Sequence, residues 1–340
     1  MADKKPYIGG QAVIEGVMMR APGCMSVAVR RPDGSIAVRE GPFRSALAQA
    51  RLWKIVGFRG VATLVESLRI GFRALQFSAE QQMTEQEKAD AKGAGKLTML
   101  LSTVFAIGLF IALPQLLAVG SASLFGFDFA MQDARFHLVI GGFKLLILLG
   151  YLLAISRVAE IKRFFEYHGA EHKTIFAYEA GLPLTLENVR RQSTLHPRCG
   201  TTFLVVVVVF SIVIGSVATP LLLPNAQGAL GQVQVLALRI GLLPLIAALS
   251  FEFQRFTARY CTRGPMRVIL WPGFLFQRIT TREPDDAQLE VAIAAMETAM
   301  WREGEGADAV SDQEPLVFPS YKAFQDALPD LRDGAVADAA

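Results

Sequence analysis

The sequence has few cysteines and none of the paired spacings typical of zinc ribbons or disulfide frameworks. Its 340 residues include three cysteines, which is an odd number, and no CxxC pair. Such a set favours reduced thiols over structural disulfides. The chain also lacks a GxGxxG pattern, a P-loop and a basic stripe with interleaved aromatic residues. The sequence therefore predicts no nucleotide-binding site, and no nucleic-acid partner is expected.

Charge is nearly absent from four long stretches of the chain, and this absence decides the predicted fold class. Hydrophobic residues make up 52% of the sequence and charged residues 19%, which is too apolar for an ordinary soluble domain. Each stretch is long enough to cross a bilayer as a helix, which takes about 20 residues. The four predicted spans are residues 97–119, 136–155, 202–223 and 233–253.

The distribution of Lys and Arg predicts how these spans are oriented. Residues 1–96, 156–201 and 254–340 hold 15, 7 and 9 of them, whereas the two intervening loops hold one between them. Because cytoplasmic loops are enriched in Lys and Arg, both termini and the central loop are predicted to be cytoplasmic. The N-terminus lacks the apolar core of a signal peptide, so the first span is expected to act as an uncleaved insertion signal.

The predicted fold is mainly α-helical: a polytopic membrane protein with a small N-terminal β-hairpin cap and cytoplasmic amphipathic helices. Residues 26–40, SVAVRRPDGSIAVRE, alternate around a PDG turn and predict the hairpin. An amphipathic helix over 45–80, with Leu68 and Phe72 on its apolar face, is equally compatible with packing on lipid or on the protein's own spans. The predicted segments are a strand-rich cap (1–44), an amphipathic helix and linker (45–96), the membrane domain (97–253) with its cytoplasmic loop (156–201), a segment with a second amphipathic helix (254–302) and a disordered tail (303–340).

The stretch YHGAEHKTIFAYE contains the pattern H-x-x-E-H, the inverted form of a metalloprotease motif. On a helix, His168 and His172 lie on the same face because they are four residues apart. Zinc enzymes use two histidines and a third ligand, and they keep one position open for water. A neighbouring carboxylate then accepts a proton from that water. The pattern therefore predicts a divalent metal, with zinc as the first choice, and Glu171 as the general base.

The spacing leaves the third metal ligand open among four residues. Glu179 lies on the same helical face as His172, and Glu252 ends the fourth predicted span, where an unpaired acid is costly. His196 and Cys199 lie in the loop before the third span, within the sequence HPRCG. The alternative interpretation of all these residues is a polar cluster that solvates the end of a helix.

Two cations interrupt the predicted spans, Lys144 and Arg239. Charges inside a membrane can mark a translocation path, or they can extend to the interface along their own side chains. The sequence favours extension to the outer interface. A small transporter is a weaker hypothesis, because four spans are few and no repeat symmetry relates them.

Four blocks of sequence together resemble one family. They are GGQAVIEGVMMR, YHGAEHKTIFAYE, LHPRCGTTF and PGFLFQRITTREPDDAQLEVAIAAM. In this order, over about residues 6–300, they resemble the YqhQ-like proteins, uncharacterised bacterial membrane proteins that are predicted to be metal-dependent enzymes. The resemblance implies a bacterial protein, which places the spans in the inner membrane. The functional core that it implies consists of His168, Glu171, His172, His196, Arg198 and Cys199, with Gln11 and Glu15 near the N-terminus.

Two hypotheses of function follow. The first is a metal-dependent hydrolase, for example a peptidase, at the cytoplasmic membrane face, in which Arg198 stabilises an oxyanion. The alternative is a non-enzymatic scaffold or assembly factor for other membrane proteins, in which the polar cluster is a buried hydrogen-bond network. The expected partners are the lipid bilayer and, in the second case, other membrane proteins. Substrate and oligomeric state do not follow from the sequence.

Overall fold

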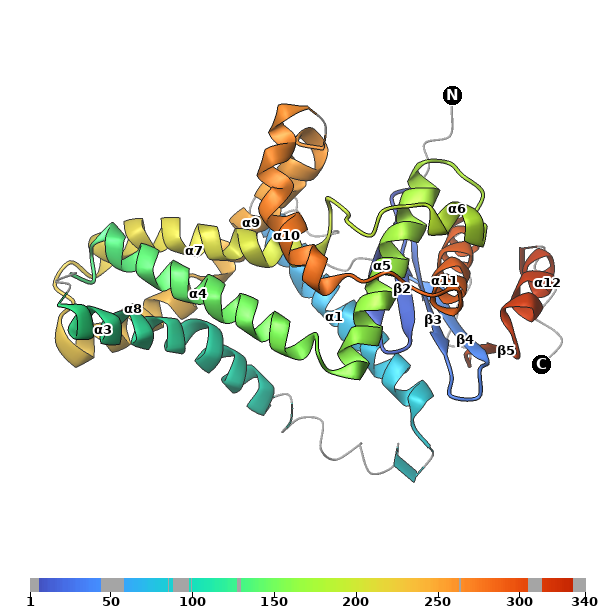
Figure 1. The fold of residues 1–340 in the computed structure, drawn as a ribbon, viewed down its shortest axis with the longest axis horizontal. Helices are drawn as coiled ribbons and strands as arrows, with labels where there is room; N and C mark the ends of the chain where they lie inside the picture. Colours follow the sequence, from blue (N-terminus) through green and yellow to red (C-terminus); the bar gives the residue numbers. More distant parts are fainter. Residues whose placement is uncertain are drawn as a thin grey trace.

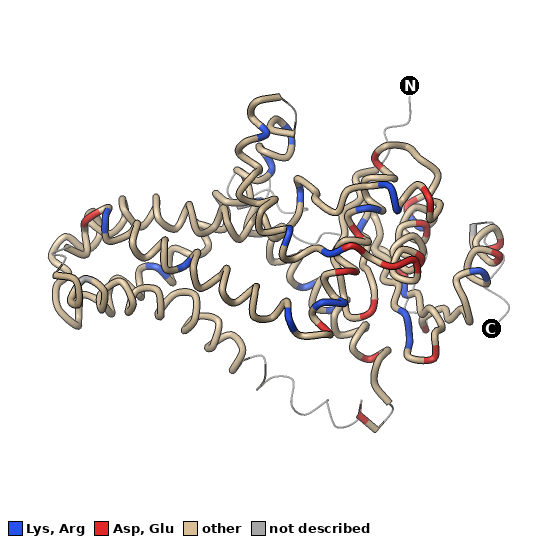
Figure 2. The backbone as a smooth tube through the Cα atoms, viewed as in Figure 1, with Lys and Arg blue, Asp and Glu red and all other residues tan. Residues whose placement is uncertain are grey.

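The computed structural model describes residues 6–43, 58–84, 86–87, 98, 100–126, 130–262, 264–304 and 314–332. The molecule is elongated, with an apolar helical bundle at one end and a body built around a β-sheet at the other (Figure 1). Charged residues concentrate in the sheet-centred body and are sparse along the bundle (Figure 2). This separation is expected if the bundle lies in lipid and the body in water.

Three helices of the bundle are long and apolar enough to span a membrane. A fourth candidate span is a pair of helices that meet at 45°. The prediction of about four apolar spans is therefore confirmed as three, or four if the bent pair is one span. The single helices are Leu100–Phe125, α4 (Ala134–Ile155) and α7 (Gly200–Leu222). The first of them includes the π-helical turn η2 (Gly108–Ala112) and α3 (Leu113–Phe125). The bent pair is α8 (Gly228–Gly241) with α9 (Leu243–Tyr260).

An antiparallel sheet of five strands, in the order β1-β2-β3-β4-β5, forms the centre of the body. The predicted N-terminal hairpin is confirmed, since Arg30 pairs with Ile36 across the PDG turn, and it forms part of this larger sheet. Successive side chains of a strand point to opposite faces, so Cys24 and Ala28 of β3 pack in one core and Val27 and Val29 in the other. The strands are β1 (Gly9–Val13), β2 (Gly16–Arg20), β3 (Cys24–Arg30), β4 (Ile36–Pro42) and β5 (Leu316–Phe318).

Helices cover both faces of the sheet. On one face, α1 (Phe58–Gln82) packs Ile70, Ala74 and Phe77 against the strands. On the other face lie α5 (Ala159–Glu179) and α11 (Asp286–Gly304), beside each other in Figure 1. The sheet is therefore the middle layer of three.

The amphipathic helix predicted over 45–80 is observed as α1, and residues 44–57 lie outside the described part of the chain. Its buried stripe differs from the predicted one: Leu68 and Phe72 are 64% and 57% exposed. The buried stripe faces the sheet because Ala74 and Phe77 complete the core there. The helix thus packs on the protein itself, while Leu68 and Phe72 of the predicted apolar stripe remain exposed.

The C-terminal segment departs from the prediction of disorder over 303–340. It contains β5 and a helix, α12 (Tyr321–Arg332). Phe324 and Leu328 of α12 are buried in the same core as α11, which explains the order. The composition around these residues, rich in Ala, Asp and Gly, obscured the short apolar stripe. Residues 305–313 and 333–340 lie outside the described part.

Replacement of Gly169 tests the close packing of α5. A Cβ at this position would collide with the backbone carbonyl oxygen of Arg282. We expect Gly169→Ala to destabilise the protein by about 1–3 kcal/mol, the usual cost of overpacking. In detergent, the melting temperature followed by intrinsic fluorescence should fall by several degrees, at about 2–4 °C for each kcal/mol.

The matched control for this change is Gly142→Ala in α4, where a Cβ would meet nothing within 4 Å. This variant should melt at the wild-type temperature or slightly above it. Equal melting temperatures for the two glycine variants would contradict the close approach at Gly169.

Candidate functional site

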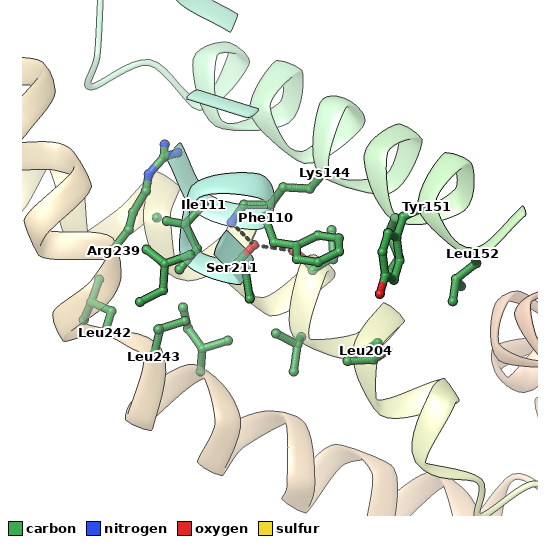
Figure 3. Close-up of a pocket in the computed structure, with 17 residues that line it drawn as sticks. Phe110, Ile111, Lys144, Tyr151, Leu152, Leu204, Ser211, Arg239, Leu242 and Leu243 are labelled. Atoms are coloured by element: carbon green, nitrogen blue, oxygen red, sulfur yellow. Dashed lines mark hydrogen bonds between the residues drawn. The ribbon is translucent and has the colours of Figure 1, made fainter. Parts of the chain in front are cut away.

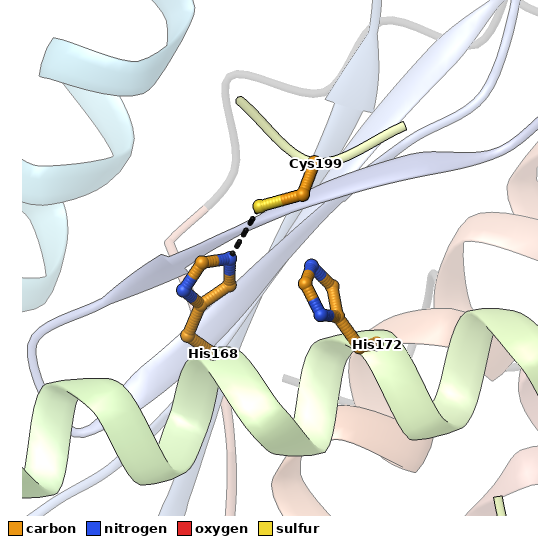
Figure 4. A group of neighbouring side chains, drawn as sticks. All are labelled: His168, His172 and Cys199. Carbon is orange, nitrogen blue, oxygen red and sulfur yellow. Dashed lines mark hydrogen bonds between the residues drawn. The ribbon is translucent and has the colours of Figure 1, made fainter. Parts of the chain in front are cut away.

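Two histidines project from the same face of α5. The chain leaves α4 at Ile155 and adopts an extended conformation at Val158 before α5 begins. His168 and His172 then lie one helical turn apart, with their ring centroids 4.5 Å from each other. The predicted pairing of these histidines on one helical face is therefore observed (Figure 4).

Cys199 completes a three-residue cluster. Its Sγ lies 3.2 Å from Nε2 of His168. One side-chain donor atom from each of His168, His172 and Cys199 lies within 4.8 Å of the others (Figure 4). Cys199 is also the N-cap of α7, where the backbone N–H of Thr201 donates to Sγ at 3.4 Å.

Backbone carbonyls fix the orientation of both rings. Nδ1 of His168 lies 2.8 Å from the carbonyl oxygen of Thr280, and Nδ1 of His172 lies 2.5 Å from that of Thr194. Because a carbonyl only accepts, each Nδ1 carries a proton and donates it. In the neutral ring each Nε2 then carries the lone pair, and Nε2 of His168 faces Sγ of Cys199. An Nδ1–H bonded to a carbonyl is the arrangement that orients metal-binding histidines.

Burial keeps the neighbouring imidazoles neutral. It lowers the pKa of His172, and it lowers the pKa of His196 to about 4. The ring centroid of His196 lies 5.5 Å from that of His172. Nε2 of His196 is buried without a hydrogen-bond partner among the described residues, and it lies 3.6 Å from a carboxylate oxygen of Glu179. His196 is therefore adjacent to the three-residue cluster but is not one of its members.

Glu171 is 5% exposed, and among the described residues no other Asp or Glu is buried. Burial raises its pKa, and the nearby His168 and His196 offset part of that rise. The carboxylate accepts a hydrogen bond from the backbone of Ala12 in β1. A Cβ at Gly10 would lie 2.6 Å from Cγ of Glu171, so the approach of β1 depends on a glycine there.

The other predicted acids and Arg198 are engaged elsewhere. Glu252 accepts two hydrogen bonds from Arg59 of α1, at 2.6 and 2.5 Å. Arg198 forms an ion pair with Glu179, and its guanidinium lies 4.4 Å from the ring centroid of Tyr7. Of the four candidates for a third ligand, the structure therefore brings Cys199 into the cluster and leaves the two acids outside it.

Gln11 and Glu15 lie on the β1–β2 hairpin. Glu15 adopts a positive φ of 51° at the turn and accepts two hydrogen bonds from Arg163, at 2.6 and 2.5 Å. Gln11 contacts Gly71 of α1 so closely that a Cβ there would collide with the amide. These contacts attach the hairpin to α5 and α1.

Several supporting groups had no motif in the sequence. Gln277, on α10 (Trp271–Thr280), is fully buried and forms hydrogen bonds of 2.8 Å with both the N–H and the carbonyl of His196. Lys173, 3% exposed, donates to the carbonyls of Arg190 and Gln192 near α6 (Leu186–Arg190), at 2.7 and 2.8 Å. The lone amide within the apolar run PGFLFQRIT could have drawn attention to Gln277. Hydrogen bonds to backbone carbonyls, such as those of Lys173, leave no signal in a sequence.

Comparison with known proteins identifies the family. The family described as "Protein of unknown function (DUF1385)" matches residues 56–302. The Bacillus subtilis (strain 168) protein named "Uncharacterized protein YqhQ" is 36% identical over 301 residues, which is 85% of this chain and 90% of that protein. The chain belongs to this family. No solved structure matches it. The resemblance to YqhQ-like proteins is thus confirmed, and the names of these relatives state no activity.

The role of Gln277 in holding the HPRCG loop can be tested by Gln277→Leu. The change leaves the buried N–H of His196 without its partner and removes one of the two donors to its carbonyl, the other being the N–H of Cys199 at 3.3 Å. The cost is about 1–3 kcal/mol, and we expect local opening to become about tenfold or more frequent. Alkylation of Cys199, followed by peptide mass spectrometry, should accelerate to the same extent.

Gln325→Leu is the matched control, because it removes hydrogen bonds to Glu297 and Tyr321 in α11 and α12, away from the loop. It should leave the alkylation rate of Cys199 unchanged. If both variants accelerate the alkylation of Cys199 equally, Gln277 has no specific role in holding the loop.

Proposed function

We propose that this protein is a metal-dependent hydrolase that binds one divalent ion, with zinc as the first choice, at His168, His172 and Cys199. The observation that carries the proposal is the convergence of their donor atoms within 4.8 Å. Both imidazoles present Nε2 because their Nδ1 atoms donate to carbonyls. Two nitrogens and one sulfur are a ligand set that zinc favours.

The spacing of the donor atoms fits such an ion. Zinc lies about 2.0–2.1 Å from histidine nitrogen and about 2.3 Å from cysteine sulfur, so tetrahedral ligands are roughly 3.3–3.8 Å apart. The separation of 3.2 Å between Cys199 Sγ and His168 Nε2 is close to this range. Small rotations of the three side chains would complete the geometry, and the fourth position would remain for water.

The roles of the surrounding residues follow from their contacts. When bound, the ion would supply an activated water at neutral pH. Glu171 is proposed to accept the proton, because it is the buried carboxylate beside His168. Arg198 is proposed to position the HPRCG loop through Glu179, since that ion pair occupies its guanidinium. An oxyanion role for Arg198 would require this pair to open.

The proposed location is the cytoplasmic face of the bacterial inner membrane. Cys199 is the N-cap of the candidate span α7, so the cluster lies where the bundle meets the sheet-centred body. The distribution of Lys and Arg favours a cytoplasmic position for this end and for both termini. A peptidase acting near the membrane surface is therefore the first enzyme class to test.

Elemental mass spectrometry of the detergent-purified protein tests the ligand set. We expect about one equivalent of zinc or another divalent metal per chain, and less than about a tenth of that in Cys199→Ala and in His168→Ala/His172→Ala. Glu252→Gln is the matched control, because Glu252 is bound to Arg59 and not to the cluster. It should retain its metal. Metal absent from the wild type, or lost equally from the Glu252 variant, would refute the site.

Glu171→Gln separates metal binding from chemistry. This variant should keep its metal and lose about 10²–10⁴-fold in kcat/KM, the usual contribution of a general base. The readout is hydrolysis of a fluorogenic peptide library by the metal-loaded protein. Glu252→Gln serves as the control carboxylate, with most activity retained, because Glu252 is bound to Arg59 and not to the cluster. Full activity of Glu171→Gln would exclude this residue as the base.

The second candidate function is the scaffold or assembly factor for other membrane proteins. The observation that favours it is the exposed apolar stripe of α1, in which Val65, Leu68 and Phe72 are each more than half exposed. In this case, proteins should copurify under mild solubilisation. The His168→Ala/His172→Ala variant would then lose stability, with no metal present in the wild type.

A further inference from the structure

A cavity of about 410 Å³ lies among the membrane helices. Residues from η2, α4, α7 and the α8–α9 pair line it (Figure 3). Two irregularities in the spans border the cavity: the π-helical turn that contains Phe110, and the bend of 45° between α8 and α9 beside Leu242. Such irregular turns occur often at functional sites. Within a membrane, irregular backbone is tolerated where it is buried in protein or lines a cavity.

Two basic side chains line this otherwise apolar space. Nζ of Lys144, from the middle of α4, donates to Oγ of Ser211 in α7 at 3.1 Å (Figure 3). Arg239, at the end of α8, is 8% exposed, and its Nη2 lies 3.0 Å from Nδ1 of His137. Its Nη1 is buried and has no hydrogen-bond partner in the described part of the chain. The sequence favoured extension of both side chains to the outer interface, but both instead lie between helices.

No acid within the described spans balances these two cations. The residues that line the cavity include no Asp or Glu. In the described residues of the four candidate spans, Glu252 is the single acid, and it is bound to Arg59. Buried charges in a membrane are costly unless they are paired, so a site with two cations and no acid calls for an anion from outside the chain.

We propose that the cavity binds an anionic amphiphile, with a phosphate head group held by Lys144 and Arg239. The remaining lining residues, such as Phe110, Leu148 and Leu243, supply an apolar wall for its hydrocarbon chain. The volume of about 410 Å³ lies within the usual range for small-ligand pockets. A polypeptide helix, about 10 Å across, would not fit in it. This site is separate from the His168 cluster and does not depend on it.

The experiment is native mass spectrometry of the full-length protein in detergent, titrated with phosphatidylglycerol. We expect one lipid to bind with high affinity, and Lys144→Gln/Arg239→Gln to weaken this binding by about 30-fold or more, because removal of a buried charge partner is costly. The control is Arg135→Gln, which alters an exposed cation at the start of α4, outside the cavity. This variant should bind the lipid like the wild type.

A second variant guards against misfolding of the charge variant. Val207→Trp fills the cavity from α7 and leaves both cations in place. It should also lose lipid binding, with a melting temperature near that of the wild type. Retention of full phosphatidylglycerol affinity in both the charge variant and Val207→Trp would overturn the proposal.

Two further ligands separate the possible sources of the phosphate. Phosphatidylcholine carries the same chains without net negative charge and should bind much more weakly. Inorganic phosphate lacks the chains and should not displace the lipid at millimolar concentration. Equal affinity for the two lipids would refute an anion site, and displacement by inorganic phosphate would refute an amphiphile site.

Discussion

The close approach of α5 to residues 280–284 is the contact on which the rest of the structure depends. It is possible because Gly169 has no side chain, so that the carbonyl of Arg282 can pass directly over the helix. The same approach lets the backbone N–H of Arg282 donate to the carbonyl of Phe165 at 2.9 Å and brings the carbonyl of Thr280 to His168. Helix α5 thereby joins the sheet, α11 and the end of the bundle, and a displacement here would separate all three from the histidine cluster.

The loop that carries Cys199 is held by buried polar groups rather than by apolar packing. Lys173 supplies two hydrogen bonds to backbone carbonyls, and Gln277 supplies both a donor and an acceptor to His196. Buried polar networks are costly when one member is missing and specific when all members are satisfied. These hydrogen bonds hold the loop, and Cys199 with it, close to the histidines of α5.

The sequence was sufficient for the parts of the fold that rest on repeating patterns. Long apolar stretches located the candidate spans, and alternation around PDG located the β3–β4 hairpin. The i, i+4 spacing of His168 and His172 was sufficient to place them together.

The choice of Cys199 over Glu179 and Glu252 as the third member of the cluster depends on the path of a loop, which no local pattern encodes. The acids are occupied by Arg198 and Arg59, and residues so distant along the chain cannot be paired by spacing alone. The helix α12 was missed because its burial depends on the core that α11 offers to Phe324.

The two proposed sites share α7 but cannot act on the same small group. Cys199 caps the beginning of this helix, and Ser211, the partner of Lys144, lies twelve residues further along it. At 1.5 Å per residue, the separation is about 18 Å along the helix axis. A head group bound at Lys144 and Arg239 is therefore too far from His168 and His172 to be hydrolysed there. The amphiphile fits the role of a structural or regulatory lipid better than that of a substrate. Loss of the lipid would alter the packing of α4, α7 and α8. This change would reach the histidine cluster through α7, which Cys199 caps, or through α4, which directly precedes α5.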